Sequence, residues 1–174
     1  MFDSFKTPDE NLETIFARQK EEALNFVMDG ANHPETIEGR IDQGILKLVE
    51  KLNSLPFLFT TKLGSCEGHA KDRGTNNIKY FPGYITFETN GSPLSNEFVD
   101  EVKMIASKFP EAFFERIDPS EYGGYKYISG AFRVNFDSKE KNGVVFPKEE
   151  ALRFEAKGKE IIQELEDLTD KFSS

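Results

Sequence analysis

Thr60-Thr61-Lys62-Leu63-Gly64-Ser65-Cys66-Glu67-Gly68-His69 is the stretch around which the rest of the chain is organised. It begins at the end of an apolar segment, Phe57 to Thr61, whose aromatic and β-branched residues are typical of an interior β-strand. It then enters a glycine-flanked loop that holds the single cysteine and one of the two histidines. We therefore expect any chemical centre of the protein to lie close to this segment.

The residues before this stretch predict two amphipathic helices. Thr7-Pro8 with Glu10 has the pattern of a helix start, and apolar residues recur at helical spacing from about 8 to 28, before Gly30 and Pro34 break the pattern. A second helix is predicted between Gly39 and Pro56. Its apolar stripe consists of Ile41, Ile45, Leu48, Val49 and Leu52.

The residues after the stretch predict a long loop and then a mixture of strands and helices. Leu63 to Lys79 shows no clear periodicity, and long ordered loops are commonly functional. Strands are predicted over residues 84–88, 112–117 and 125–136, the last two as a hairpin, with helices after Ser92-Pro93 and after Pro147. This order predicts a single α+β domain over residues 1–174, with a mixed or mainly antiparallel sheet covered by about four helices.

Composition limits the classes of partner. The chain has 174 residues and a net charge of −9, which disfavours a broad electrostatic grip on nucleic acid, although nucleic acid stays open as a partner. The window from Lys62 to Lys79 is nevertheless net positive and favours an anionic ligand near the loop, unless it is an ordinary solvated loop. One cysteine, no secretory signal and no apolar run of about 20 residues predict a cytoplasmic protein without a membrane partner. The sequence leaves the oligomeric state open.

Cys66 and His69 admit several chemical interpretations. Their spacing suits two ligands of a zinc ion, but a closed site needs four, and His33 is the only other histidine, so no metal is predicted. His69 could instead lower the pKa of the Cys66 thiol for nucleophilic attack. Alternatively Ser65, the loop amides, His69 and Lys71 could bind a carboxylate, a phosphate or a nucleobase edge, or Cys66 could simply pack inward beside a tight turn. The residues alone favour these last two interpretations about equally.

An ordered set of residues carries a resemblance to a known family. Its members are Phe16, Lys20, Leu24, Gly39-Arg40-Ile41-Asp42, Ile45, Leu48, Asn53, Thr60-Thr61 and Ser65-Cys66-x-Gly68. Over residues 16 to 69 this set resembles the N-terminal part of the wybutosine-synthesis tRNA methyltransferase family. That family has a Phe-x-x-x-Lys helix, a Lys-Gly-Ser-Ile-Asp segment, an Ile-Asn before the strand and a Thr-Thr-Ser-Ser-Cys-Ser-Gly-Arg sequence.

The chain departs from the family pattern at several positions. Glu38 and Arg40 replace a lysine and a serine, and Glu67 replaces a serine. Lys62-Leu63-Gly64 lengthens the approach to Ser65, and His69 stands where the family has arginine. An imidazole is mostly neutral at its ordinary pKa of about 6.5, so it does not replace the bidentate cation of arginine.

The resemblance implies an α+β fold with a barrel-like sheet and methyl transfer from S-adenosylmethionine to a modified guanine of tRNA. With the acidic composition, we expect a nucleobase or small-molecule substrate. The expected catalytic residues are His69, Cys66 and Asp42, although Asp42 is also explained as a helix N-terminal acid. The expected cofactor-binding residues are Ser65, Gly68, Thr61 and Lys71. The alternative is a non-catalytic binding or interaction protein on the same scaffold.

Overall fold

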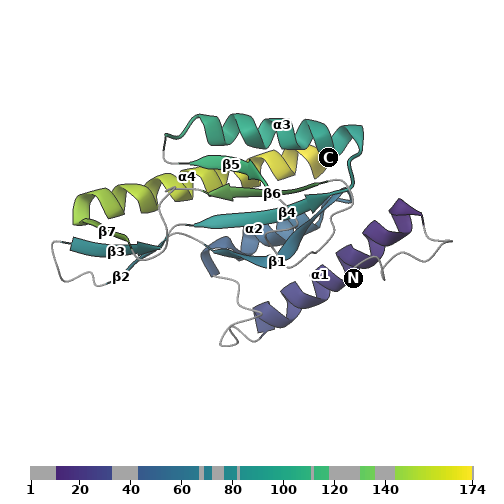
Figure 1. Ribbon diagram of the computed structural model, residues 1–174, viewed down its shortest axis with the longest axis horizontal. Coiled ribbons are helices and arrows are strands. Elements are labelled where there is room, and N and C mark those ends of the chain that lie inside the picture. Colours follow the sequence, from purple (N-terminus) through teal and green to yellow (C-terminus); the bar gives the residue numbers. More distant parts are fainter. Residues whose placement is uncertain are drawn as a thin grey trace.

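A computed structural model describes residues 11–32, 43–66, 69–71, 77–81, 83–110, 112–117, 130–135 and 144–173. The elements follow one another along the chain as shown in Figure 1: α1 (Leu12–Asn32), α2 (Gln43–Asn53), β1 (Leu58–Cys66), β2 (His69–Lys71), β3 (Asn77–Phe81), β4 (Tyr84–Thr89), α3 (Pro93–Ser107), β5 (Phe113–Arg116), β6 (Gly130–Asn135), β7 (Val144–Pro147) and α4 (Lys148–Ser173). This is the predicted α+β class. None of the described helices is long and apolar enough to cross a bilayer.

The described strands form two antiparallel sheets. The larger sheet has the order β1-β4-β6-β5, and the smaller has the order β2-β3-β7. All of their pairings are antiparallel, which confirms the predicted strand direction. The pairing of β5 with β6 also confirms the predicted hairpin partners. The larger sheet is open, with β1 and β5 at its two edges, so the expectation of a barrel-like sheet was wrong.

Three helices bury one face of the larger sheet. In Figure 1, α2 and α4 pass behind this sheet, α3 runs beside β5, and α1 lies beneath β1, which it contacts. The predicted apolar stripe of α2 is completely buried where the structure describes its side chains, at Ile45, Leu48, Val49 and Leu52. Helix α3 begins as its sequence predicts, because the Ser92 hydroxyl accepts the Ser95 N–H and Pro93 lacks the N–H that a first turn leaves unpaired.

Phenylalanine side chains supply much of this core. Phe98 is completely buried, and its ring contacts those of Phe57, Phe87 and Phe172 at centroid distances of 5.7, 6.3 and 5.3 Å. Beyond Phe87, ring contacts continue through Phe132 to β5. The cluster thus joins β1, β4, β6, β5, α3 and the last turn of α4.

The boundaries of two predicted elements were wrong. Helix α1 continues to Asn32 instead of ending near residue 28, because a glycine inside a helix costs only about 1 kcal/mol relative to alanine and does not by itself end it. The loop predicted over Leu63 to Lys79 is largely strand, since β1 runs to Cys66 and β2 and β3 follow. The predicted cap at Thr7 lies outside the described residues. The described helix has Asn11 before it, whose side-chain oxygen accepts the Thr14 N–H at 2.8 Å.

A bulge explains why the second half of β1, beyond Thr61, was not predicted as a strand. Thr60 is opposite Phe87 and Ser65 is opposite Ile85, so β1 advances five residues where β4 advances two. The extra residues fall in Thr61 to Gly64, which contains the Lys62-Leu63-Gly64 segment. Extra residues in one strand break the two-residue alternation, and this hides the strand from a periodicity analysis.

Candidate functional site

The second face of the larger sheet carries polar side chains. Along β4, Ile85 and Phe87 point into the core, so Tyr84, Thr86 and Glu88 lie on the opposite face. Antiparallel partners share a face, and Arg133 of β6 is opposite Thr86. With Thr61 of β1, these residues make up what we call the polar sheet face: Thr61, Tyr84, Thr86, Glu88 and Arg133.

Three members of the polar sheet face are buried. Glu88 is 0% exposed, Thr86 1% and Thr61 8%. The hydroxyls of Thr61 and Thr86 are hydrogen-bonded at 2.7 Å, and Thr61, Thr86 and Glu88 all take part in further interactions within the protein. A buried carboxylate is costly unless it is compensated, and such groups concentrate at functional sites or in structural networks.

Arg133 and Tyr84 form the half-buried side of this face. The Arg133 guanidinium carbon lies 4.3 Å from the centroid of the Tyr84 ring, which is cation–π geometry. Together the polar sheet face holds two hydroxyls, a carboxylate, a guanidinium and a phenol, of which the guanidinium of Arg133 and the phenol of Tyr84 are partly exposed. Such a set can bind the hydroxyls of a ribose and the edge of a nucleobase.

A buried amide joins α2 to β1 at the entrance of this strand. The Asn53 side-chain N–H groups donate to the Val49 carbonyl at 2.9 Å and to the Thr60 hydroxyl at 2.8 Å. Its oxygen accepts the Thr60 backbone N–H at 2.8 Å. Asn53 therefore fixes the position of Thr60, and with it that of the neighbouring Thr61.

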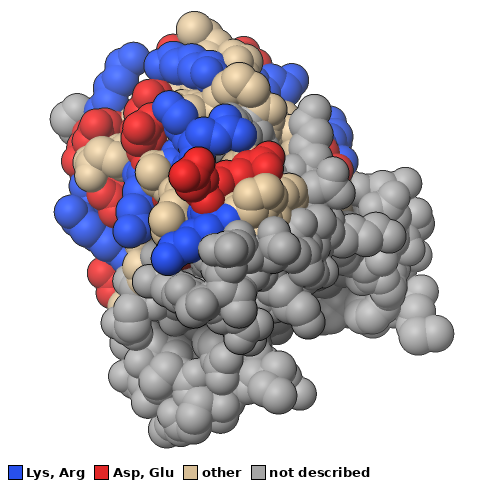
Figure 2. All heavy atoms as spheres, turned by 90° about the vertical axis from the view of Figure 1, so that its left-hand side faces the viewer, with Lys and Arg blue, Asp and Glu red and all other residues tan. Residues whose placement is uncertain are grey.

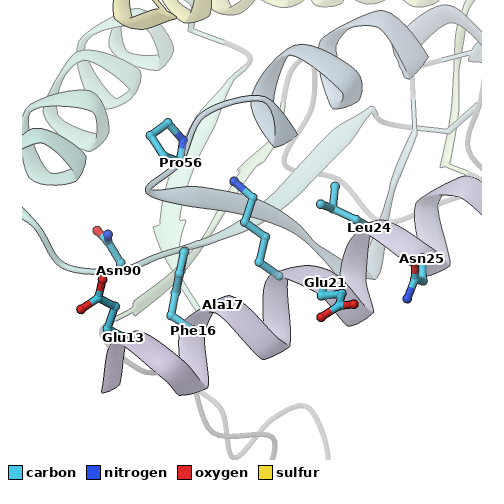
Figure 3. Close-up of a pocket in the computed structure, with 9 residues that line it drawn as sticks. Glu13, Phe16, Ala17, Glu21, Leu24, Asn25, Pro56 and Asn90 are labelled. Atoms are coloured by element: carbon cyan, nitrogen blue, oxygen red, sulfur yellow. The ribbon is translucent and has the colours of Figure 1, made fainter. Parts of the chain in front are cut away.

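A pocket of about 620 Å³ lies between α1 and the start of β1, and we call it the α1 pocket. This volume is within the range of about 300–1,000 Å³ that is usual for small-molecule sites. Its lining residues are Glu13, Phe16, Ala17, Lys20, Glu21, Leu24, Asn25, Pro56 and Asn90. Figure 3 shows Pro56 and Asn90 across the pocket from α1, with Glu13 and Phe16 directed toward that side.

Lys20 is the cation of the α1 pocket. Its ammonium donates a hydrogen bond to the Leu55 carbonyl in the turn that precedes β1. Burial lowers the pKa of Lys20 below its usual value, because the charged form loses hydration. Phe16, one turn earlier, packs its ring on Phe59 at 5.2 Å, which holds this part of α1 against β1.

The structure places the sequence-predicted site residues that it describes on β1 and β2, which belong to different sheets. Thr61 belongs to the polar sheet face, and Cys66 and Ser65 are opposite Tyr84 and Ile85 in the backbone ladder. His69 and Lys71 begin and end β2, opposite Phe81 and Lys79. Asp42 and Gly68 lie outside the described residues.

Sequence reasoning missed Thr86, Glu88 and the α1 pocket. Tyr84 to Glu88 alternates polar and apolar residues, which is typical of a strand with one solvated face, whereas the structure buries two of the polar residues. A usable signal was present for Lys20, because Phe16, Lys20 and Leu24 recur every four residues and so share one face of α1. Among the described residues, no three His, Cys, Asp or Glu side chains gather as a metal site would require.

No protein-family model and no curated protein matches the sequence. Among solved structures, the PH1069 protein of Pyrococcus horikoshii is similar, with a TM-score of 0.49 and 16% identity over 91% of this chain and 92% of that chain. A structure of the PH1069 protein from Pyrococcus horikoshii OT3 gives a TM-score of 0.45 and 15% identity, covering 97% of this chain and 93% of that one. These are weak likenesses, so the site is interpreted from its own residues.

Proposed function

We propose that the protein is an S-adenosylmethionine-dependent methyltransferase of the wybutosine type that acts on a nucleobase or a small molecule. One observation carries the proposal. Three residues of the family-like set contact the segment from Leu55 to Thr60: Phe16 packs on Phe59 of β1, Lys20 bonds to the Leu55 carbonyl before β1, and Asn53 bonds to Thr60. Members of the set from α1 and α2 thus contact the same short segment of the chain, as residues of one functional region would.

The donor groups present fit a nucleoside-type cofactor. The partly exposed phenol of Tyr84 and guanidinium of Arg133 can bond to ribose hydroxyls or an adenine edge, and Thr61 lies on the same face of the sheet. We assign this role to the sequence-predicted residues Thr61, Ser65, Gly68 and Lys71. When bound, S-adenosylmethionine supplies an electrophilic methyl group, and the electron pair of the broken sulfur–carbon bond stays on sulfur.

The chain has to orient the acceptor and take up a proton. The acceptor nitrogen gives its lone pair to the new bond, and its proton passes to an imidazole nitrogen of His69, whose ordinary pKa of about 6.5 suits a general base near neutral pH. Cys66 and Asp42 are the other proposed catalytic residues. Alignment of the reacting atoms supplies much of the remaining acceleration in such a transfer.

The surface charge supports a small acceptor over a polynucleotide. Figure 2 shows one face, on which Lys and Arg side chains are interspersed with Asp and Glu across the described part. A polyanion is usually held by clustered cations, and the chain as a whole has a net charge of −9.

Calorimetric titration with S-adenosylmethionine tests the proposal first, followed by methyl transfer from labelled donor to guanine nucleosides. We expect saturable binding and a turnover that falls at least about 100-fold in His69→Gln, the usual scale for a general base. The exposed Lys159→Met variant is the control. An absence of binding at millimolar ligand contradicts the proposal, and binding with no turnover on any tested acceptor favours the non-catalytic alternative.

A further inference from the structure

The α1 pocket combines charges of both signs with an apolar wall. Lys20 supplies one cation, and Glu13 and Glu21 supply two carboxylates that are exposed along the same helix. Phe16, Leu24 and the exposed Pro56 form apolar surface beside them. A ligand that matches this arrangement carries a carboxylate and an ammonium close together on an apolar stem.

Lys20 is suited to receive the carboxylate of such a ligand. An ammonium has three N–H donors, and the bond to the Leu55 carbonyl uses one of them. Half-burial removes part of the water around this ammonium. A ligand carboxylate would replace the interaction that water makes with the ammonium of an exposed lysine. The side chain is held in place at the pocket, which reduces the entropy that it would lose on binding.

We propose that the α1 pocket binds an α-amino-acid group, with its carboxylate on Lys20, its ammonium beside the neighbouring Glu21, and its side chain against Phe16 and Leu24. Two sources share this chemistry: a free apolar amino acid and the methionine end of S-adenosylmethionine. We assign the second, and this choice of source rests on the proposed function. The polar sheet face is not needed for the assignment.

The proposal is tested with ligands that lack either the carboxylate or the ammonium, because the α1 pocket is expected to bind both. In the ¹⁵N–¹H spectrum of the full chain, L-methionine and S-adenosylhomocysteine should shift the backbone amides of Ala17, Glu21 and Asn90. The methyl ester of methionine, which lacks the carboxylate, and N-acetylmethionine, which lacks the ammonium, should each bind at least about tenfold more weakly. Equal binding of methionine and its ester overturns the assignment of Lys20.

Variants of Lys20 and Ala17 distinguish a loss of ligand binding at the pocket from a loss of stability of the fold. Lys20→Met should weaken binding of both ligands about tenfold or more, and Lys20→Arg should recover part of it. Ala17 is exposed and lines the pocket, so Ala17→Leu should block binding without a loss of stability. Lys159→Met removes an exposed lysine of α4 and should bind normally. Normal binding by a folded Ala17→Leu variant would place the ligand elsewhere.

The relative affinities of the two ligands identify the source of the amino-acid group, and turnover is measured separately. Tighter binding of S-adenosylhomocysteine than of methionine supports the assigned source, whereas equal affinities assign the pocket to a free amino acid. If methyl transfer occurs with an unchanged KM for the donor in Lys20→Met, the pocket proposal fails and the proposed function stands. If the ligands bind at the pocket and no acceptor is methylated, the proposed function fails and the pocket stands. If neither ligand shifts the pocket amides, the pocket proposal is wrong.

Discussion

The Lys20 ammonium donates a hydrogen bond to the Leu55 carbonyl, and burial disfavours its charged form. The pKa of Lys20 in the folded protein is below its usual 10.5, because part of its hydration is lost. Between this lowered pKa and 10.5, the unfolded chain binds more protons than the folded chain does. Stability therefore rises with pH in that window, and the cost of burying the charge is fully present below it.

This pH dependence can be measured against a variant without the charge. The free energy of unfolding is measured in urea at pH 7 and at pH 10 for the wild type and for Lys20→Met. The difference between the wild type and the variant should shift in favour of the wild type at pH 10. Lys159→Met corrects for other groups that titrate, and its difference from the wild type should stay constant. A difference for Lys20→Met that falls with pH would contradict the direction of the pKa shift.

Asn53 is a second residue whose side-chain hydrogen bonds stabilise the fold. Replacing it with alanine removes three hydrogen bonds and leaves the buried Thr60 N–H without this acceptor. A buried polar group that loses its partner costs about 1–3 kcal/mol, so we expect Asn53→Ala to destabilise the protein by about 2–4 kcal/mol in urea unfolding. Asn96→Ala makes the same change at an exposed position of α3 and should stay within about 0.5 kcal/mol. Similar effects of the two variants would show that the Asn53 bonds contribute little.

At the scale of elements, the sequence predicted what local patterns determine. Helices α2 and α3 could be predicted from the apolar stripe Ile45 to Leu52 and from the helix start at Ser92-Pro93, because spacing and capping act within a few residues. The extension of β1 past Thr61 and the strands β2 and β3 were not predictable in this way. They depend on partners distant in sequence, as when Cys66 pairs with Tyr84 and Tyr80 pairs with both Ala70 and Val144.

The candidate site was predictable only in part for the same reason. Thr61 was expected at a site because it stands in a distinctive segment, and the structure places it beside Thr86. Glu88 was not expected, because an alternating strand does not reveal whether its second face is covered. Only the burial of Glu88 and Thr86 shows that this face belongs to the interior.

The bond between Thr61 and Thr86 joins β1 to β4 next to the bulge, and a double-mutant cycle tests it. Thr61→Val and Thr86→Val each keep the side-chain shape and remove one hydroxyl. Each should cost about 1–3 kcal/mol, and the double variant should cost less than their sum by at least about 0.5 kcal/mol, because neither hydroxyl then loses its partner alone. Strict additivity in urea unfolding would mean that the two hydroxyls are not coupled.

At the scale of the whole molecule, phenylalanine rings connect segments from both halves of the chain. Phe57 and Phe172 stand near the start of β1 and the end of α4, and both contact Phe98. The sequence has 17 phenylalanines and no tryptophan, so most of its aromatic rings are those of phenylalanine. It could not show which rings meet, because these contacts join residues 41 and 74 positions apart.

Phe98→Ala should therefore weaken the whole fold. Phe98 is 0% exposed and lies among three other rings, so its removal leaves a cavity that several elements share. A buried phenylalanine replaced with alanine costs about 3–5 kcal/mol, and each kcal/mol lowers Tm by about 2–4 °C in a chain of this size. Met104→Ala, on the same helix at 58% exposure, should change Tm little. Calorimetry that shows similar Tm values for the two variants would mean that the aromatic cluster does not hold the larger sheet and the helices together.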